Sequence, residues 1–176
     1  MSQLNKGAWL LIFSLFTGPS VQQGKRITID HFKHEPVEIV SIKQSGTLLQ
    51  IGDSIKTVPD WPTTIEITIK NVSPEPVSYI EVSLYSVGPG DKDTTFYSNY
   101  IYGSRAGGAR LLQPGETTTL TRDKVSGDLN GTEPAKVLIQ RVMWNNDDSR
   151  MWSGGKLLRK NPTTKQYEKE GEAVAH

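Results

Sequence analysis

The chain has 176 residues, with 20 basic and 19 acidic side chains and a formal net charge of +1. This length suits one ordinary domain, and the balanced charge gives no reason to expect nucleic acid or an anionic membrane as a partner. The absence of cysteine excludes disulfides, thiol catalysis and thiolate metal sites.

The N-terminus has the three-part layout of a secretory signal peptide. Lys6 provides a basic start, residues 7–16 are uncharged and apolar, and residues 17–20 supply a turn with small side chains. We therefore expect residues 1–20 to be a signal peptide and the protein to be secreted or periplasmic. An uncleaved membrane anchor and a buried first strand are the alternatives. The apolar run is short for a transmembrane helix, which needs about 20 apolar residues, so we expect no membrane span in the mature form.

Short runs rich in β-branched residues follow, separated by turn residues, which is the pattern of β-strands. The expected strands occupy residues 26–32, 37–43, 47–51 and 54–58. Residues 59–62, Pro-Asp-Trp-Pro, predict a rigid corner.

Residues 64–87 are the most regular part of the chain. Isoleucines alternate with polar residues before a proline-containing turn at residues 71–76, and aliphatic residues alternate again after it. This period of two predicts two strands that pair as a hairpin with one apolar face. The expected inward and outward side chains are, respectively, Ile65, Ile67, Ile69, Ile80, Val82 and Leu84, and Glu66, Lys70 and Glu81.

Residues 88–110 are irregular and rich in Tyr, Ser, Asn and Gly, although residues 95–102 could form a strand. Tyrosine offers a large contact area at low entropic cost, as in antibody loops, and arginine offers fork-shaped donors. We therefore consider this segment a candidate recognition loop; the alternative is that its tyrosines cover the outer face of a sheet. The candidate binding residues are Tyr97, Tyr100, Tyr102, Arg105 and Arg110.

The C-terminal part predicts further strands at residues 117–121, 137–144, 150–152 and 156–159. Residues 137–144 are the most apolar of these and are expected to form a central strand. Residues 161–176 are expected to be a polar flexible tail. The whole pattern predicts an all-β, antiparallel, immunoglobulin-like sandwich of about 7–9 strands within residues 25–160.

The loop at residues 145–149 is flanked by two tryptophans. Trp144 and Trp152 are expected to pack across a hairpin, or alternatively to stack on a sugar. Asn145, Asp147 and Asp148 have the oxygen ligands that Ca²⁺ prefers, but Asn and Asp are also common turn residues. We favour the turn interpretation and expect no metal and no cofactor.

No motif for nucleophilic, phosphate-binding or metal-dependent catalysis is present in the sequence. Aspartates and glutamates are plentiful, but no spacing singles out a catalytic pair. The sequence therefore favours a non-enzymatic protein, with a small carboxylate-dependent hydrolase as a weaker alternative.

Two short motifs are similar to those of exported bacterial immunoglobulin-like modules of the FxLYD-like group. The matching residues are Ile69, Asn71, Ser73, Val77, Ile80, Val82, Leu84 and Tyr85, then Leu112, Pro114, Gly115 and Glu116. Val82 stands where that motif has Phe, and Ser86 where it has Asp. The resemblance implies a β-sandwich on an exported protein with an accessory or binding role, and no catalytic residue.

From these observations we expect an exported, non-catalytic domain that binds a protein or cell-surface partner through residues 88–110. The alternative is a structural subunit of an envelope assembly that offers its sheet edges.

Overall fold

The computed structural model describes residues 25–56, 60–87, 94–104, 110–125, 134–145 and 147–170. The signal-like segment lies outside these residues. The described part is almost entirely strand, with one short 3-10 helix, η1 (Trp61–Thr64), at the corner predicted for residues 59–62. The strands are β1 (Lys25–Asp30), β2 (Val37–Gln44), β3 (Thr47–Leu49), β4 (Ser54–Ile55), β5 (Ile65–Asn71), β6 (Val77–Val87), β7 (Thr94–Gly103), β8 (Thr117–Thr119), β9 (Thr121–Val125), β10 (Ala135–Trp144), β11 (Asp147–Ser153), β12 (Lys156–Lys160) and β13 (Tyr167–Lys169).

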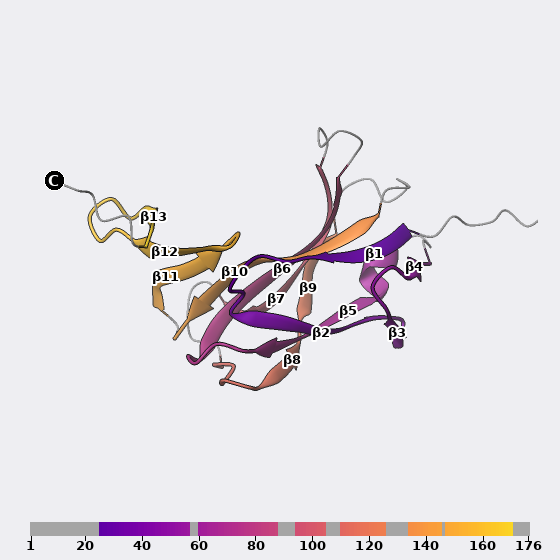
Figure 1. The fold of residues 1–176 in the computed structure, drawn as a ribbon, viewed down its shortest axis with the longest axis horizontal. Coiled ribbons are helices and arrows are strands. Elements are labelled where there is room, and N and C mark those ends of the chain that lie inside the picture. Colours follow the sequence, from indigo (N-terminus) through magenta and orange to yellow (C-terminus); the bar gives the residue numbers. More distant parts are fainter. Residues whose placement is uncertain are drawn as a thin grey trace, which may run out of the picture.

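These strands form two sheets that pack as a sandwich, which confirms the predicted all-β class (Figure 1). The larger sheet has the order β13-β12-β11-β10-β6-β7-β9; β1 also pairs with β10, and β4 pairs with β1. The smaller sheet has the order β3-β2-β5-β8. All neighbouring strands are antiparallel except β1 and β10, which are parallel. Strands β11 to β13 carry the larger sheet outward at one end of the molecule (Figure 1).

The predicted hairpin of residues 64–87 does not form. β5 lies in the smaller sheet, between β2 and β8, whereas β6 lies in the larger sheet, between β10 and β7. Residues 72–76 therefore cross from one sheet to the other, and the isoleucines of β5 face the aliphatic side chains of β6 across the core. The fully buried members include Ile67, Ile69, Ile80, Val82 and Leu84.

β10 is central in the larger sheet, as predicted for residues 137–144, but its outward side chains are only partly buried, whereas β6 is buried on both faces. The inner face of β6 packs in the core. Its outward side chains are also buried, and two of them, Glu81 and Ser83, form hydrogen bonds with side chains of the neighbouring strands. Glu81 is buried, in contrast to the exposure predicted for it, and it accepts hydrogen bonds from Tyr79 Oη at 3.1 Å and Arg141 Nη1 at 3.3 Å. Ser83 donates to Asn99 Oδ1 at 2.8 Å. A buried carboxylate is tolerated here because it is paired and hydrogen-bonded.

The crossing at residues 72–76 is held by Asn71, whose side chain is fully buried. Its Nδ2 donates to the carbonyl oxygens of Glu75 and Leu112, both at 2.9 Å, and its Oδ1 accepts from the backbone and hydroxyl of Ser73. The Asn71 side chain thus adds hydrogen bonds to backbone groups around the crossing, where Pro74 and Pro76 lack N–H donors.

The C-terminal residues differ from the predicted flexible tail over residues 161–170. β13 pairs with β12, and Arg159 Nη2 donates to Glu170 Oε1 at 2.7 Å. Asn161 organises the connecting turn, because its Oδ1 accepts from the backbone of Thr163 and Thr164. This polar segment is therefore ordered by turn chemistry and strand pairing without an apolar core of its own.

Candidate functional site

The tyrosines proposed for recognition mostly lie inside the protein. Tyr97 and Tyr100 are each 1% exposed, on the inward face of β7. Tyr97 Oη accepts from Lys25 Nζ at 3.0 Å and lies 2.7 Å from Ser86 Oγ, and its ring packs edge-on against Trp61 at 5.1 Å. Because they are buried, neither Tyr97 nor Tyr100 can contact a partner at the surface, which corrects their assignment as binding residues.

The hydroxyls of Tyr100 and Tyr102 also have hydrogen-bond partners within the protein. Tyr100 Oη donates to Pro62 O at 2.8 Å, and burial raises the pKa of Tyr100 above its ordinary value of 10.0. Tyr102 Oη donates to Arg110 O at 2.6 Å, and its pKa is also raised, mainly by burial. Arg110 is exposed and forms an ion pair with Glu116. Arg105 and the rest of residues 88–93 and 105–109 lie outside the described residues.

The two tryptophans are core residues, so they do not form an exposed platform for a sugar. Trp144 is buried and donates from Nε1 to Ser73 Oγ at 3.3 Å, with the guanidinium of Arg150 4.9 Å from its ring centre. Trp152 is buried and packs edge-on against Phe32 at 5.8 Å.

The Asn/Asp loop has the contacts of a turn. Asn145 has a positive φ of 53°, and its Nδ2 donates to Glu75 Oε2 at 3.4 Å. Asp148 is paired with Lys160, and the side chain of Asp147 is not described. Within the described residues, no group of three His, Asp or Glu side chains is arranged to hold a metal ion.

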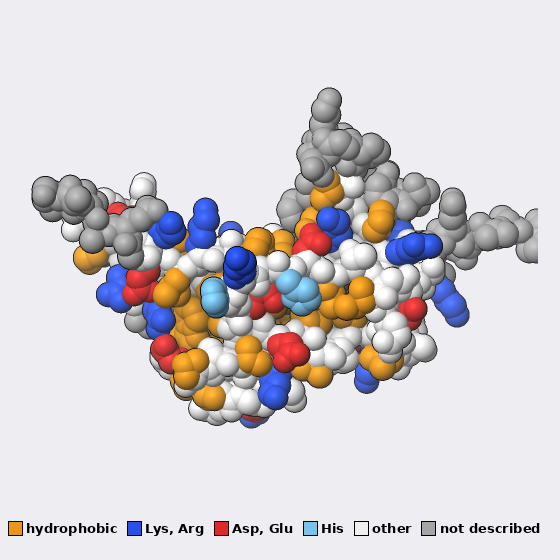
Figure 2. All heavy atoms as spheres, viewed as in Figure 1, with side chains coloured by type: hydrophobic (Ala, Val, Ile, Leu, Met, Phe, Trp, Pro, Cys, Tyr) orange, Lys and Arg blue, Asp and Glu red, His pale blue; other side chains and the backbone are white. Residues whose placement is uncertain are grey.

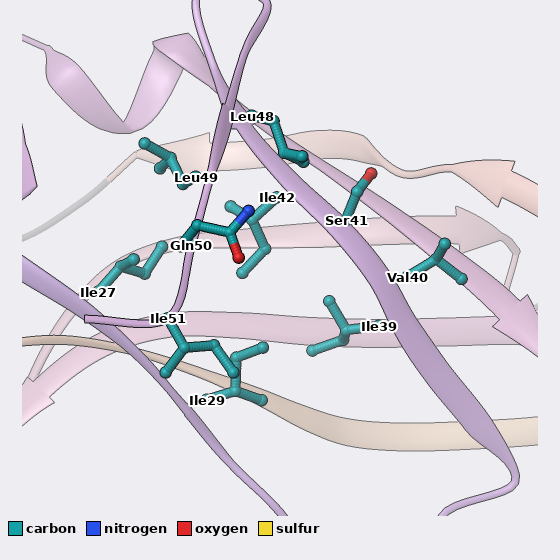
Figure 3. A pocket seen from close by; sticks show the side chains of 10 residues that line it. All are labelled: Ile27, Ile29, Ile39, Val40, Ser41, Ile42, Leu48, Leu49, Gln50 and Ile51. Carbon is teal, nitrogen blue, oxygen red and sulfur yellow. The ribbon is translucent and has the colours of Figure 1, made fainter. Parts of the chain in front are cut away.

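A different feature has the character of a binding site: an apolar slot between β1 and β2. Its volume is about 230 Å³, and eight of its ten lining residues are aliphatic while none is charged. The lining is Ile27, Ile29, Ile39, Val40, Ser41, Ile42, Leu48, Leu49, Gln50 and Ile51 (Figure 3). Ile29 and Ile51 lie next to each other on one side, and Ile39 points toward them from β2 (Figure 3).

The slot is bordered by strand edges that no described strand occupies. β2 pairs with β5 along its whole length but with β3 only over Ile42–Gln44, so residues 38–41 have one open edge within the described chain. Across the slot, β1 pairs with β4 only through Lys25 and Arg26. Open edges are ready templates for pairing with another strand.

The backbone of β1 presents hydrogen-bonding groups to this edge. Ile27 N–H donates to Asp53 O at 2.9 Å, and Ile27 O accepts from Gly52 N at 2.8 Å, so Ile27 bonds away from β10. Because bonding direction alternates along a strand, the N–H and C=O of Ile29 point to the same side. Among the described residues, the edge of β1 beside Ile29 is therefore open for one further pair of ladder bonds.

Exposed apolar side chains surround the slot. Val40 is 51% exposed, Leu48 52% and Ile51 68%, and they are three of the five large hydrophobic residues found exposed in the described chain. Val40 stands at an irregularity in the β2–β5 register, between Ile39 and Ser41, which turns it outward. Figure 2 shows apolar side chains reaching the surface over the gap between β1 and β2.

Comparison with protein-family models, with curated proteins and with solved structures finds no match to this chain. The resemblance to FxLYD-like modules therefore stays an expectation from the motifs. In the described chain no helix is long and apolar enough to cross a membrane.

Proposed function

We propose that this protein is an exported, non-catalytic binding module that captures an extended, uncharged apolar segment of a partner protein in the slot. The observation that carries this proposal is the coincidence of two open strand edges with a charge-free aliphatic lining. A strand added there would gain backbone hydrogen bonds from the edges and specificity from the side chains that it places in the slot. The geometry thus favours assembly through sheet edges over recognition through the tyrosines.

The size of the slot limits what it accepts. A cavity of about 150 Å³ lined by aliphatic and aromatic side chains admits one benzene, so about 230 Å³ suits one large or two small apolar side chains. In an extended segment, such side chains stand at alternate positions, because side chains on one face of a strand repeat every second residue. A charged residue at either position would lose its hydration without gaining a partner.

The expected affinity is modest. Covering the exposed parts of Val40, Leu48 and Ile51 contributes roughly 3 kcal/mol, and each new backbone hydrogen bond adds about 0.5–1.5 kcal/mol. Association and ordering oppose this by several kcal/mol. We therefore expect a dissociation constant for a short peptide roughly in the micromolar to millimolar range.

The test uses a fluorescent peptide of roughly seven alternating valines and threonines, a typical strand length, titrated with the domain and followed by anisotropy. The same peptide with N-methyl groups on alternate residues keeps the side chains but loses the donors, so it should not bind. A peptide with aspartate in place of the central valine should also fail. Equal binding of the N-methylated peptide would exclude strand pairing.

A matched pair of protein variants locates the binding. Val40→Lys places a charge at the slot, whereas Val72→Lys changes a residue of similar exposure, 49%, at the crossing between β5 and β6. We expect Val40→Lys to weaken peptide binding by about tenfold or more and Val72→Lys to leave it unchanged, with both variants folded. Equal weakening by the two variants would contradict the slot as the site.

Export is tested by N-terminal sequencing of the protein from its native source, where an intact Met1 would contradict a cleaved signal.

A further inference from the structure

A second concave surface lies on the outer face of the larger sheet, over β10, β11 and β12. It encloses about 470 Å³, within the usual range for small-molecule sites. Register places Met143 beside Met151 and Arg141 beside Ser153 on this face, which points away from the smaller sheet and from the slot. The lining is Arg141, Met143, Asp148, Met151, Ser153, Lys160, Lys165 and Tyr167; we call it the basic cleft.

The charges of the basic cleft are unbalanced. Three of its lining residues are basic and one is acidic. Lys160 is paired with Asp148, whereas Lys165 is exposed and has no ion-pair partner among the described residues. Arg141 is paired with Glu81, so the surplus positive charge that attracts an anion to this concave surface is that of Lys165.

Arg141 is held in place from behind. Its Nη1 lies 3.3 Å from Glu81 Oε2, and the same carboxylate oxygen accepts from Tyr79 Oη at 3.1 Å. Arginine has five N–H donors in a rigid fork, so a single bond to Glu81 leaves donors for a ligand. A guanidinium fixed in this way has already lost much of the rotamer freedom that binding would otherwise remove.

The basic cleft also has apolar and aromatic lining residues. Met143 is buried and Met151 is half-buried, and both line the cleft. Methionine is polarisable and adapts to ligands of irregular shape. Tyr167 forms part of the wall and is fixed by a hydrogen bond from its Oη to Asp148 O at 2.5 Å.

We propose that the basic cleft binds a small amphiphilic anion, in which a carboxylate or phosphate group is joined to an apolar chain. The anionic group lies among Arg141, Lys160 and Lys165, and the apolar chain covers Met143 and Met151. This site shares no lining residue with the slot, so its test is independent of the proposed function.

Isothermal titration of the domain with octanoate and with octyl phosphate, below micelle formation, tests the proposal. Inorganic phosphate supplies the anion alone, and octanol supplies the chain alone. We expect at least one amphiphile to bind about tenfold more tightly than either half; the stronger of the two identifies carboxylate or phosphate as the preferred group. Equal binding of inorganic phosphate, equal binding of octanol, or no binding of any probe would overturn the proposal.

Two variants and a control assign the binding to this surface. Lys165→Asn removes a charge at a position with φ of 61°, which asparagine tolerates. It should lower the affinity for the amphiphile about two- to fivefold, as for the loss of one exposed ionic contact. Met151→Ala should lower the affinity for the amphiphile without changing how that affinity depends on salt concentration. Lys70→Ala, in the smaller sheet, should change nothing. Loss of affinity in Lys70→Ala equal to that in Lys165→Asn would show a nonspecific charge effect and contradict the site.

Discussion

Asn71 links the two sheets through four side-chain hydrogen bonds. It bonds Ser73, Glu75 and Leu112 from a fully buried position, and its own backbone N–H donates to Glu116 O at 3.0 Å. Few side chains can serve a buried carbonyl and a buried N–H at once, because this requires both a donor and an acceptor. The residue therefore fixes the direction in which the chain leaves the smaller sheet.

Replacing Asn71 with leucine should destabilise the protein strongly. The change keeps the volume but removes the four side-chain hydrogen bonds, at about 0.5–1.5 kcal/mol each. The carbonyl oxygens of Glu75 and Leu112 keep one other donor each, Ser73 Oγ and Val77 N–H. We expect the free energy of unfolding in urea to fall by about 2–4 kcal/mol. Asn99→Leu is the control: it removes one hydrogen bond, from Ser83 Oγ, at an incompletely buried position, and should cost less. A loss from Asn71→Leu no larger than that of the control would contradict the role of Asn71.

Tyr100 should make stability fall in alkaline solution. Burial raises its pKa in the folded state above the ordinary 10.0. Below pH 10.0 the phenol is protonated in both states and its contribution is fully present; above that pH the unfolded chain loses the proton first, and stability is lost as pH rises toward the folded pKa. Urea unfolding at about pH 8 and about pH 11 measures this decline.

Tyr100→Phe is the matched variant for that measurement. It removes the titrating group and the hydrogen bond to Pro62 O, so it should be slightly less stable at neutral pH and should decline less steeply in alkali. An identical decline in both proteins would assign the pH dependence to other groups.

At the scale of the element, β6 is the centre of the larger sheet. It pairs with β10 along one edge and with β7 along the other, so its backbone and both faces are covered. The period-two pattern predicts this strand correctly, but it predicts a solvent-facing side for Glu81, which the structure buries beside Arg141. The reason is the long Arg141 side chain, whose position depends on a strand roughly sixty residues away.

Leu84→Asp should prevent folding. Leu84 is fully buried between Val137 and Ser98 on the neighbouring strands. An unpaired carboxylate at this position costs several kcal/mol, a large part of the roughly 5–15 kcal/mol that stabilises a typical domain. Circular dichroism should show no cooperative thermal transition. Leu84→Met, which conserves volume, should cost less than about 1.5 kcal/mol; a near-native melt of Leu84→Asp would show that its side chain is not in the core.

At the scale of the whole molecule, the sandwich formed by the described residues is incompletely closed along one side. β3 and β4 are only three and two residues long, so neither covers the facing edges of β1 and β2. The slot follows from this, because aliphatic side chains that belong to the core reach the surface where the strands that should cover them end. The basic cleft lies on a separate face, and the molecule therefore offers two surfaces of opposite chemical character.

The sequence by itself determines most of the strands and the two short turns with positive φ at Ser45-Gly46 and Gly52, because alternation and turn chemistry are local properties. It does not predict β13, which forms by pairing with β12. Only the tertiary structure decides which strands are neighbours. β5 and β6 are adjacent in sequence and lie in different sheets, and Tyr97 is buried because Lys25, Trp61 and Ser86 surround it from distant parts of the chain. The slot also depends on contacts between distant parts of the chain. The sequence pattern predicts that its aliphatic residues are core residues, but they lie at the surface because no described strand pairs with the edges beside them.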